Sequence, residues 1–420
     1  MTADYLIDDT TMSAIANQIR RISGDTSGMT AADALEVLSN VQGEVVEGSQ
    51  YKVQAIDPFY WSADDRLKSG MYDEGTLFAA PIPKTYQDFT FDKWVAPIHV
   101  DGSLLKVEDY PVVMGAVYKP TSDELQIWVS TSNTTTMQFY ALNLPRQVDW
   151  GDGVIEDYSS GASSLYYTHT YANPNKTYRI RCINPRQNDL YMRKLSEDDA
   201  TLRSIHKVAF PSSMTTAYTN FLSPNMSCFI TISDGVTRIA DDSYGADRDD
   251  ITGLTSIIIP PSVETVGIYA FYKCVDLRYV VLGYGVKTIR RYAFCYCNNL
   301  STIALPNTIT TIDDHAFSNS GLTEIIIPAS VTSISESAFS DCVLNKVIWR
   351  SSADIPKYLI ANAAPTSFII EYDGRVLSYS GGLKTHTRIY VPDALVNTYK
   401  STDGWSGNAS YIYPLSQYNG

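Results

Sequence analysis

Leu254-Thr-Ser-Ile-Ile-Ile-Pro-Pro-Ser-Val263 begins the first of four copies of one short phrase. The phrase restarts at Leu277, Leu300 and Leu322, so the period is 23, 23 and 22 residues. A unit of this size cannot bury its own apolar face and must stack on its neighbours. The repeat therefore predicts a solenoid of stacked coils, with an extended surface for interaction.

Seven positions of the repeat stay apolar in all four copies and predict its inward face. In the first copy they are Leu254, Ile257, Ile259, Val263, Val266, Ala270 and Phe271. Parallel strands about 4.8 Å apart bring each residue against its counterpart in the next coil. We therefore expect apolar ladders inside the stack.

Three of the six cysteines share one repeat position. Cys274, Cys297 and Cys342 each follow a phenylalanine by three residues, and Ser320 takes this place in the remaining copy. A small buried side chain suits both choices. We expect free thiols rather than disulfides or zinc ligands, because no CxxC pair has a second pair or a histidine partner.

The residue between the two inward strand positions points outward and forms a second apolar ladder. Its members are Ile258, Val281, Ala304, Ile326 and Ile348. An exposed apolar face implies a cover, which could be a neighbouring chain, another domain of this chain or a receptor. The alternative is β-propensity on a tolerated surface. Further candidates for a glycan- or protein-binding surface are Tyr279, Tyr284, Tyr296 and Trp349.

The pattern Leu-x-x-Ile-x-Ile-Pro, followed by Val-x-x-Ile and Ala-Phe-x-x-Cys, resembles the BspA-like leucine-rich repeats of bacterial and phage surface proteins. This resemblance implies a leucine-rich-repeat solenoid over 191–350 that serves adhesion. We expect 351–420 to form a C-terminal cap. Its helix begins near Pro392 and buries Leu395, Val396 and Tyr399.

Val148-Asp-Trp-Gly-Asp-Gly153, with His169-Thr-Tyr171 and Tyr178-Arg-Ile-Arg-Cys182, resembles a polycystic-kidney-disease (PKD) type immunoglobulin-like domain. The resemblance implies a β-sandwich over 111–190. Trp150 can pack into such a sandwich, and Asp152-Gly153 tolerates the positive φ of a hairpin turn. We interpret Asp149 and Asp152 as turn residues rather than calcium ligands, because the full spacing of a calcium loop is absent.

The segments before this domain divide into two. Residues 48–110 are aromatic-rich without a period and predict a small β-rich module. Residues 1–47 predict two short helices whose apolar stripes need another copy of the chain or a partner. The stripes are Met12, Ile15, Ile19 and Ile22, then Leu35 and Leu38.

Asp8-Asp-Thr-Thr-Met-Ser-Ala-Ile-Ala-Asn-Gln-Ile-Arg20, with Gly28-Met-Thr30, resembles the start of tail-associated structural proteins of phages and prophages. The resemblance implies that this end joins the particle. The first nine residues have neither the basic region nor the apolar core of a secretory signal. We therefore expect synthesis in a host cytoplasm and a location in the virion.

Composition and motifs limit the function classes. A net charge of −14 argues against nucleic-acid binding, and no apolar run is long enough to insert into a membrane. The five histidines lie far apart, and no catalytic, phosphate-loop or dinucleotide motif is present. We expect no enzyme, no metal and no cofactor. The acidic loop Asp241–Asp250 is read as solvated, with a calcium site as the alternative.

These observations predict a mainly β, multidomain chain with a short helical start. The favoured hypothesis is a non-enzymatic virion protein of a tail, baseplate or fibre. Its N-terminal helices would bind other tail proteins, with a homo-oligomer expected, and its repeats would bind a glycan or protein on the host cell. The alternatives are a bacterial surface adhesin and a purely structural baseplate or decoration protein.

Overall fold

The computed structural model describes the chain from β1 onward, with gaps. The described residues are 50–56, 66–80, 89–98, 100, 104–106, 112–120, 122–132, 135–142, 145–158, 164–185, 205–218, 228–241, 250–359, 365–379, 383 and 387–418. The expected helices of 1–47, with Met12, Ile15, Ile19, Ile22, Leu35 and Leu38, and most of the acidic loop lie outside these residues. Among the described residues, no helix is both long and apolar enough to cross a membrane.

The first part of the fold is a four-stranded sheet in the order β2-β1-β6-β4. Its strands are β1 (Gln50–Ile56), β2 (Arg66–Asp73), β4 (Phe89–Val95) and β6 (Val112–Pro120), and a separate pair is formed by β3 (Leu77–Ala79) and β5 (Leu104–Lys106). We call the four strands the N-terminal sheet.

The N-terminal sheet corrects the expected boundary at residue 110. β6 pairs in parallel with β1 and antiparallel with β4, so it is a central strand of this sheet and not the first strand of a sandwich. Met114, Ala116 and Tyr118 of β6 are fully buried. The apolar run from Val112 to Tyr118 suits a position covered on both faces.

The second part is a six-stranded sheet in the order β10-β9-β12-β7-β13-β15, with a separate hairpin of β8 and β11. The bounds are β7 (Leu125–Ser130), β8 (Thr136–Leu142), β9 (Pro145–Asp149), β10 (Ile155–Asp157), β11 (Ser164–Thr170), β12 (Thr177–Pro185), β13 (Ile205–Phe210) and β15 (Phe229–Ile232). β13 pairs antiparallel with β7 and in parallel with β15. The sheet therefore leads directly into the parallel coils. The likeness to a PKD-type sandwich stays a prediction.

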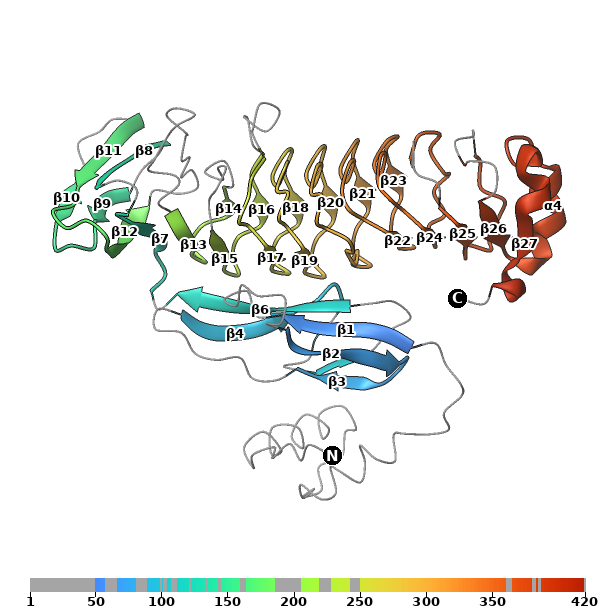
Figure 1. Cartoon of the computed structure of the whole chain (residues 1–420), viewed down its shortest axis with the longest axis horizontal. Helices are drawn as coiled ribbons and strands as arrows, with labels where there is room; N and C mark the ends of the chain where they lie inside the picture. Colours follow the sequence, from blue (N-terminus) through green and yellow to red (C-terminus); the bar gives the residue numbers. More distant parts are fainter. Residues whose placement is uncertain are drawn as a thin grey trace, which may run out of the picture. The chain divides into compact units, whose positions relative to one another are not determined.

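The solenoid follows as predicted, with two sets of parallel strands (Figure 1). One set is β14 (Thr216–Ala217), β16 (Arg238–Ile239), β18 (Thr265–Val266), β20 (Thr288–Ile289), β21 (Thr311–Ile312) and β23 (Ser333–Ile334). The other is β17 (Ser256–Ile259), β19 (Tyr279–Leu282), β22 (Glu324–Ile327), β24 (Lys346–Trp349), β25 (Ser367–Ile370), β26 (Arg388–Val391) and β27 (Ile412–Pro414). Equivalent repeat positions face one another, as Ile257 and Val280 do.

The stack continues beyond residue 350, which corrects the expected separate cap. β24, β25, β26 and β27 pair in parallel, so 351–420 adds further coils. The helix predicted near Pro392 is present, and its Tyr399 is fully buried. The helical elements are η2 (Asp393–Leu395), α4 (Val396–Ser401), η3 (Ser406–Tyr411) and η4 (Leu415–Gln417).

Apolar ladders fill the interior as the repeat predicts. Phe271, Phe294, Phe317 and Phe339 stack with ring centroids 5.3, 5.4 and 5.2 Å apart. The shared cysteine position is also buried, and the Cys297 thiol lies 3.3 Å from the Phe271 carbonyl oxygen. All six cysteines are buried, and none forms a disulfide bond.

Removing one ring of the phenylalanine ladder should destabilise the whole stack. We expect Phe294→Ala to lower the free energy of unfolding by about 3–5 kcal/mol, because neighbouring coils held in register cannot close the cavity. Urea unfolding followed by circular dichroism measures this. Val343→Ala is the control, because Val343 is 68% exposed and its loss should cost about 0.5 kcal/mol or less. Equal effects of the two changes would contradict the stacked ladder.

Candidate interaction surface

The outward apolar ladder is covered by the chain's own N-terminal sheet over its first members. Ile258 and Val281 form a buried cluster with Val95 of β4 and Val117 of β6. Gly115 of β6 permits this close approach, because a Cβ atom there would lie 2.5 Å from Cγ1 of Ile258. Of the three covers considered from the sequence, the structure shows another domain of the same chain.

Further contacts fix the N-terminal sheet in this position. The ring of Phe89 lies 5.0 Å from that of Trp128 and 6.2 Å from that of Phe229. Thr231 of β15 donates a hydrogen bond to the Tyr118 carbonyl, and Lys93 forms an ion pair with Asp234. The ion pair is partly exposed and contributes little, so apolar burial dominates this interface.

The rest of the ladder is only partly covered. Ala304 and Ile326 are half-buried against the core of the N-terminal sheet, and Ile348 is half-buried in the next coil. Tyr279 packs against the Ile258–Val281 cluster. Apart from Ile348, these residues, proposed from the sequence as an interaction surface, therefore serve mainly an internal contact.

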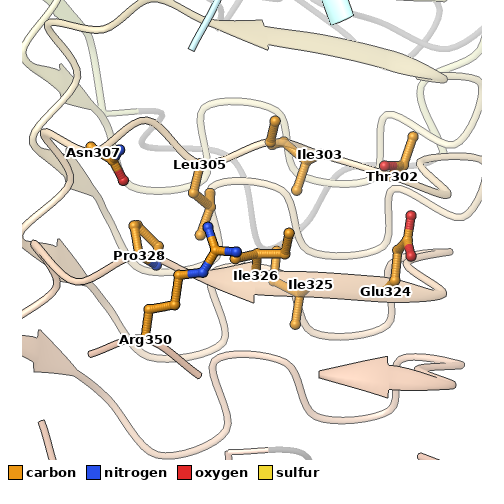
Figure 2. Close-up of a pocket in the computed structure, with 10 residues that line it drawn as sticks. Thr302, Ile303, Leu305, Asn307, Glu324, Ile325, Ile326, Pro328 and Arg350 are labelled. Atoms are coloured by element: carbon orange, nitrogen blue, oxygen red, sulfur yellow. The ribbon is translucent and has the colours of Figure 1, made fainter. Parts of the chain in front are cut away.

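A small hollow opens beside Ala304 and Ile326, where the parallel sheet is interrupted (Figure 2). Residues 302–305 occupy the strand position of their coil but form no strand, whereas the equivalent residues form β19 and β22. Arg350 extends along one end of the hollow beside Leu305 and Ile326, and it pairs with Glu371 at 2.6 Å. The cavity volume of about 30 Å³ has room for one or two water molecules.

A cluster of aromatic rings lies where the coils turn. We call Tyr269, Tyr272, Tyr292 and Tyr296 the tyrosine patch. Tyr269 stacks on Tyr292 with centroids 4.8 Å apart, and Tyr272 makes edge-to-face contacts with the other three rings.

Two cations lie over ring faces of the tyrosine patch. Arg291 lies 4.8 Å from the Tyr292 centroid, and Lys273 lies 5.7 Å from the Tyr272 centroid. Burial raises the pKa of Tyr272 to about 12, so its phenol stays protonated.

Backbone geometry positions these rings. Tyr269, Tyr292 and Tyr296 have positive φ values of 58°, 57° and 60°, which side chains other than glycine rarely adopt. The equivalent residues of the next coil, His315 and Asn319, share this conformation. The sequence analysis selected only Tyr296. Tyr269 and Tyr292 also share one repeat position, directly before Ala-Phe, and this signal could have identified the patch.

Of the remaining surface candidates, two are exposed and one is buried. Tyr284 is 42% exposed and Tyr296 is 39% exposed, as a surface role requires. Trp349 is fully buried, so its assignment to the surface was wrong. It pairs with Ile327 and Ile370 in the inward position of β24, and its indole N–H donates to the Ala353 carbonyl at 3.2 Å.

The Trp-Gly-Asp-Gly segment forms a hydrogen-bonded turn around a buried Trp150. Asp149 accepts a hydrogen bond from the Gly151 N–H at 2.8 Å and pairs with Arg181. Asp152 accepts one from the Val154 N–H at 3.1 Å and lies 2.8 Å from Nε2 of His169. Both carboxylates thus serve the turn. In the described part of the chain, no group of three or more His, Cys, Asp or Glu side chains could hold a metal ion.

A charge placed under the N-terminal sheet should release that sheet. We expect Val281→Asp to cost about 3 kcal/mol or more and to speed amide exchange in β6, because Val281 is 1% exposed and a buried carboxylate has no partner there. Hydrogen exchange with mass spectrometry measures both effects. Ile348→Asp changes the same repeat position where it is half-buried and should leave β6 protected. Loss of β6 protection in both variants, or in neither, would contradict the cover.

Acid should weaken the Trp150 turn through Asp152. Burial acts to raise the pKa of Asp152, but hydrogen bonds from His169 and Val154 outweigh it and lower the pKa below its ordinary 3.8. The folded state then binds this proton less tightly than the unfolded state, so Asp152 stabilises the fold above pH 3.8 and loses this effect as pH falls through its lowered pKa. The difference in melting temperature between the native protein and Asp152→Asn should shrink from pH 5 to pH 2. A difference independent of pH would contradict this.

Comparison with known families identifies the coils. Residues 249–364 match the BspA type leucine rich repeat region, in six copies. No curated protein matches the chain.

Solved structures of repeat proteins match with low overall similarity. A leucine-rich repeat protein from Bacteroides ovatus is 22% identical at a TM-score of 0.29, over 46% of this chain and 51% of that one. The pneumococcal vaccine antigen PcpA is 14% identical at 0.29, over 50% and 66%. A leucine rich cell surface protein from Faecalibacterium prausnitzii is 22% identical at 0.28, over 46% and 66%. The chain thus spans between half and two thirds of these proteins. Its residues 249–364 form a leucine-rich-repeat solenoid of BspA type.

Proposed function

We propose that this chain is a non-enzymatic adhesion protein whose leucine-rich coils carry the binding surface. The tyrosine patch is the observation that carries this proposal. Tyrosine and arginine dominate the energetic centres of recognition surfaces, because their large rigid groups lose little conformational entropy on binding. The N-terminal sheet covers the apolar ladder, whereas Tyr296 of the patch stays 39% exposed.

Two of the described histidines have surroundings that suit a structural role. His169 stacks on Trp150 with centroids 4.8 Å apart and supports a turn, and His315 packs beside Tyr292 at 5.0 Å. A catalytic histidine is normally poised toward a pocket and a nucleophile. The proposal includes no metal and no cofactor.

The proposed location is the outer surface of a bacterium. The leucine rich cell surface protein of Faecalibacterium prausnitzii is one of the proteins with similar coils, and adhesion requires such a position.

A virion protein is the second candidate, favoured by the resemblance of Asp8–Arg20 to phage tail proteins. In that case the stripe with Met12 and Ile15 joins the particle, and the coils face the host. Immunogold labelling of phage particles and of bacterial envelopes distinguishes the two locations. Label on tails supports the virion role, and label on envelopes alone supports the adhesin.

The adhesion role predicts saturable binding to cells. Fluorescently labelled full-length protein should bind intact epithelial or bacterial cells with a plateau, and excess unlabelled protein should compete. Flow cytometry over a concentration series measures both. Binding that rises linearly on every cell type without competition would contradict an adhesion role. Cells treated with protease or glycosidase then show which class of surface molecule is bound.

A further inference from the structure

The tyrosine patch lies in a stretch of sequence that is more basic than the chain as a whole. Residues 261–300 carry five basic and two acidic side chains, whereas the whole chain has a net charge of −14. Carboxylates of neighbouring coils, Asp241, Asp313 and Asp314, lie beside Arg290 and Arg291 of this stretch. Lys273 and Arg291 of this segment lie over rings of the patch. A local positive charge beside aromatic rings favours a ligand that carries negative charge.

Arg291, which also donates a hydrogen bond to the Tyr292 hydroxyl at 3.4 Å, can exchange its carboxylate partner for such a ligand. Its guanidinium lies 3.6 Å from the Asp314 carboxylate, and both side chains are substantially exposed. An exposed pair of this kind contributes about 0–1 kcal/mol, so replacing Asp314 by another anion costs little. Lys273 stands on the same group of rings and can contact a second negative group of the ligand.

The rings are held in place before any ligand arrives. Tyr272 is 9% exposed and meets the rings of Tyr269, Tyr292 and Tyr296 at interplanar angles of 88°, 81° and 89°. These contacts leave little freedom to lose on binding. Tyr269 and Tyr292 stack on each other, and both side chains are half-buried.

The backbone of the patch is already paired. The N–H groups of Tyr269, Tyr292 and Tyr296 donate to the carbonyls of Arg291, Asp314 and Ser318 in the next coil, at 3.0, 3.2 and 3.0 Å. An added peptide strand would need such groups for pairing. The patch therefore offers side-chain hydroxyls and cations, which suit a ligand rich in hydroxyl groups and acids.

We propose that the tyrosine patch binds an acidic polysaccharide, with its carboxylate or sulfate groups on Arg291 and Lys273 and its hydroxyl groups on the phenols. This inference rests on the proposed adhesion function and names the class of ligand.

Titration calorimetry of the full-length protein tests the proposal. The probes are polygalacturonate oligosaccharides, a sulfated heparin fragment, neutral dextran and polyglutamate. We expect binding of one or both acidic glycans, weakening at higher salt, and none of dextran. The two acidic glycans show whether carboxylate or sulfate is preferred. Polyglutamate bound as tightly as the acidic glycans would overturn the proposal in favour of an acidic peptide.

Matched variants locate the site. Arg291→Gln and Tyr296→Asn should each weaken glycan binding at least tenfold, and asparagine suits this backbone because Asn319 holds the equivalent position. Lys287→Gln and Tyr284→Ala remove exposed residues outside the patch and should change the affinity less than twofold. Circular dichroism confirms that each variant folds. Equal loss in both pairs would overturn the proposal.

The experiments distinguish failure of the glycan site from failure of the adhesion role. Saturable cell binding that Arg291→Gln leaves unchanged keeps the adhesion role and overturns the glycan site. Glycan binding without any cell binding keeps the site and removes the adhesion role.

Discussion

The N–H of Phe271 donates to the carbonyl of Ala293, and the N–H of Phe294 donates to that of Ala316, at 2.8 Å in both cases. Bonds of this kind set the register between neighbouring coils, and register places every side chain beside its counterpart. A repeat of 22 or 23 residues cannot bury its apolar residues otherwise. The phenylalanine ladder, the cysteine position and the outer rows of side chains all depend on this pairing.

The register between coils also aligns the apolar ladder on the outside of the stack. Such a ladder is unfavourable in water, so another element must cover it. The N-terminal sheet meets this need at Ile258 and Val281, where Gly115 allows the two backbones to approach. Because the first members of the ladder are buried in this way, we assign recognition to the turns of the coils. There the same register brings Tyr269 over Tyr292 and forms the tyrosine patch.

Much of the fold could be predicted from the sequence, because the period of the apolar residues along the chain matches the positions that are buried. The inward positions of the repeat and the helix containing Tyr399 were predicted from spacing, and the burial of Trp150 was predicted from its motif; all three are present. Later coils such as β25 and β26 were missed because they lack the Ala-Phe phrase. Trp349 was wrongly assigned to the surface, because the assignment followed its aromatic side chain rather than its inward position in the repeat.

Contacts between distant segments could not be predicted. Lys93 and Asp234 are far apart in the chain, and no local pattern tells which element covers the ladder. The same holds for β6, whose apolar residues fit the edge of a sandwich as well as the centre of a sheet. The tyrosine patch could be predicted only in part. The repeat shows which tyrosines share a position, but the contacts between their rings depend on the geometry of the coils.

The most direct test of the covered ladder is a double-mutant cycle between Gly115 and Ile258. Gly115→Ala should destabilise the native protein by collision with the Ile258 side chain, and Ile258→Ala should destabilise it by loss of buried contact. If β6 docks on this ladder, the double variant loses at least about 1 kcal/mol less free energy of unfolding than the sum of the two single losses. Strictly additive losses would contradict the docking of the N-terminal sheet on the coils.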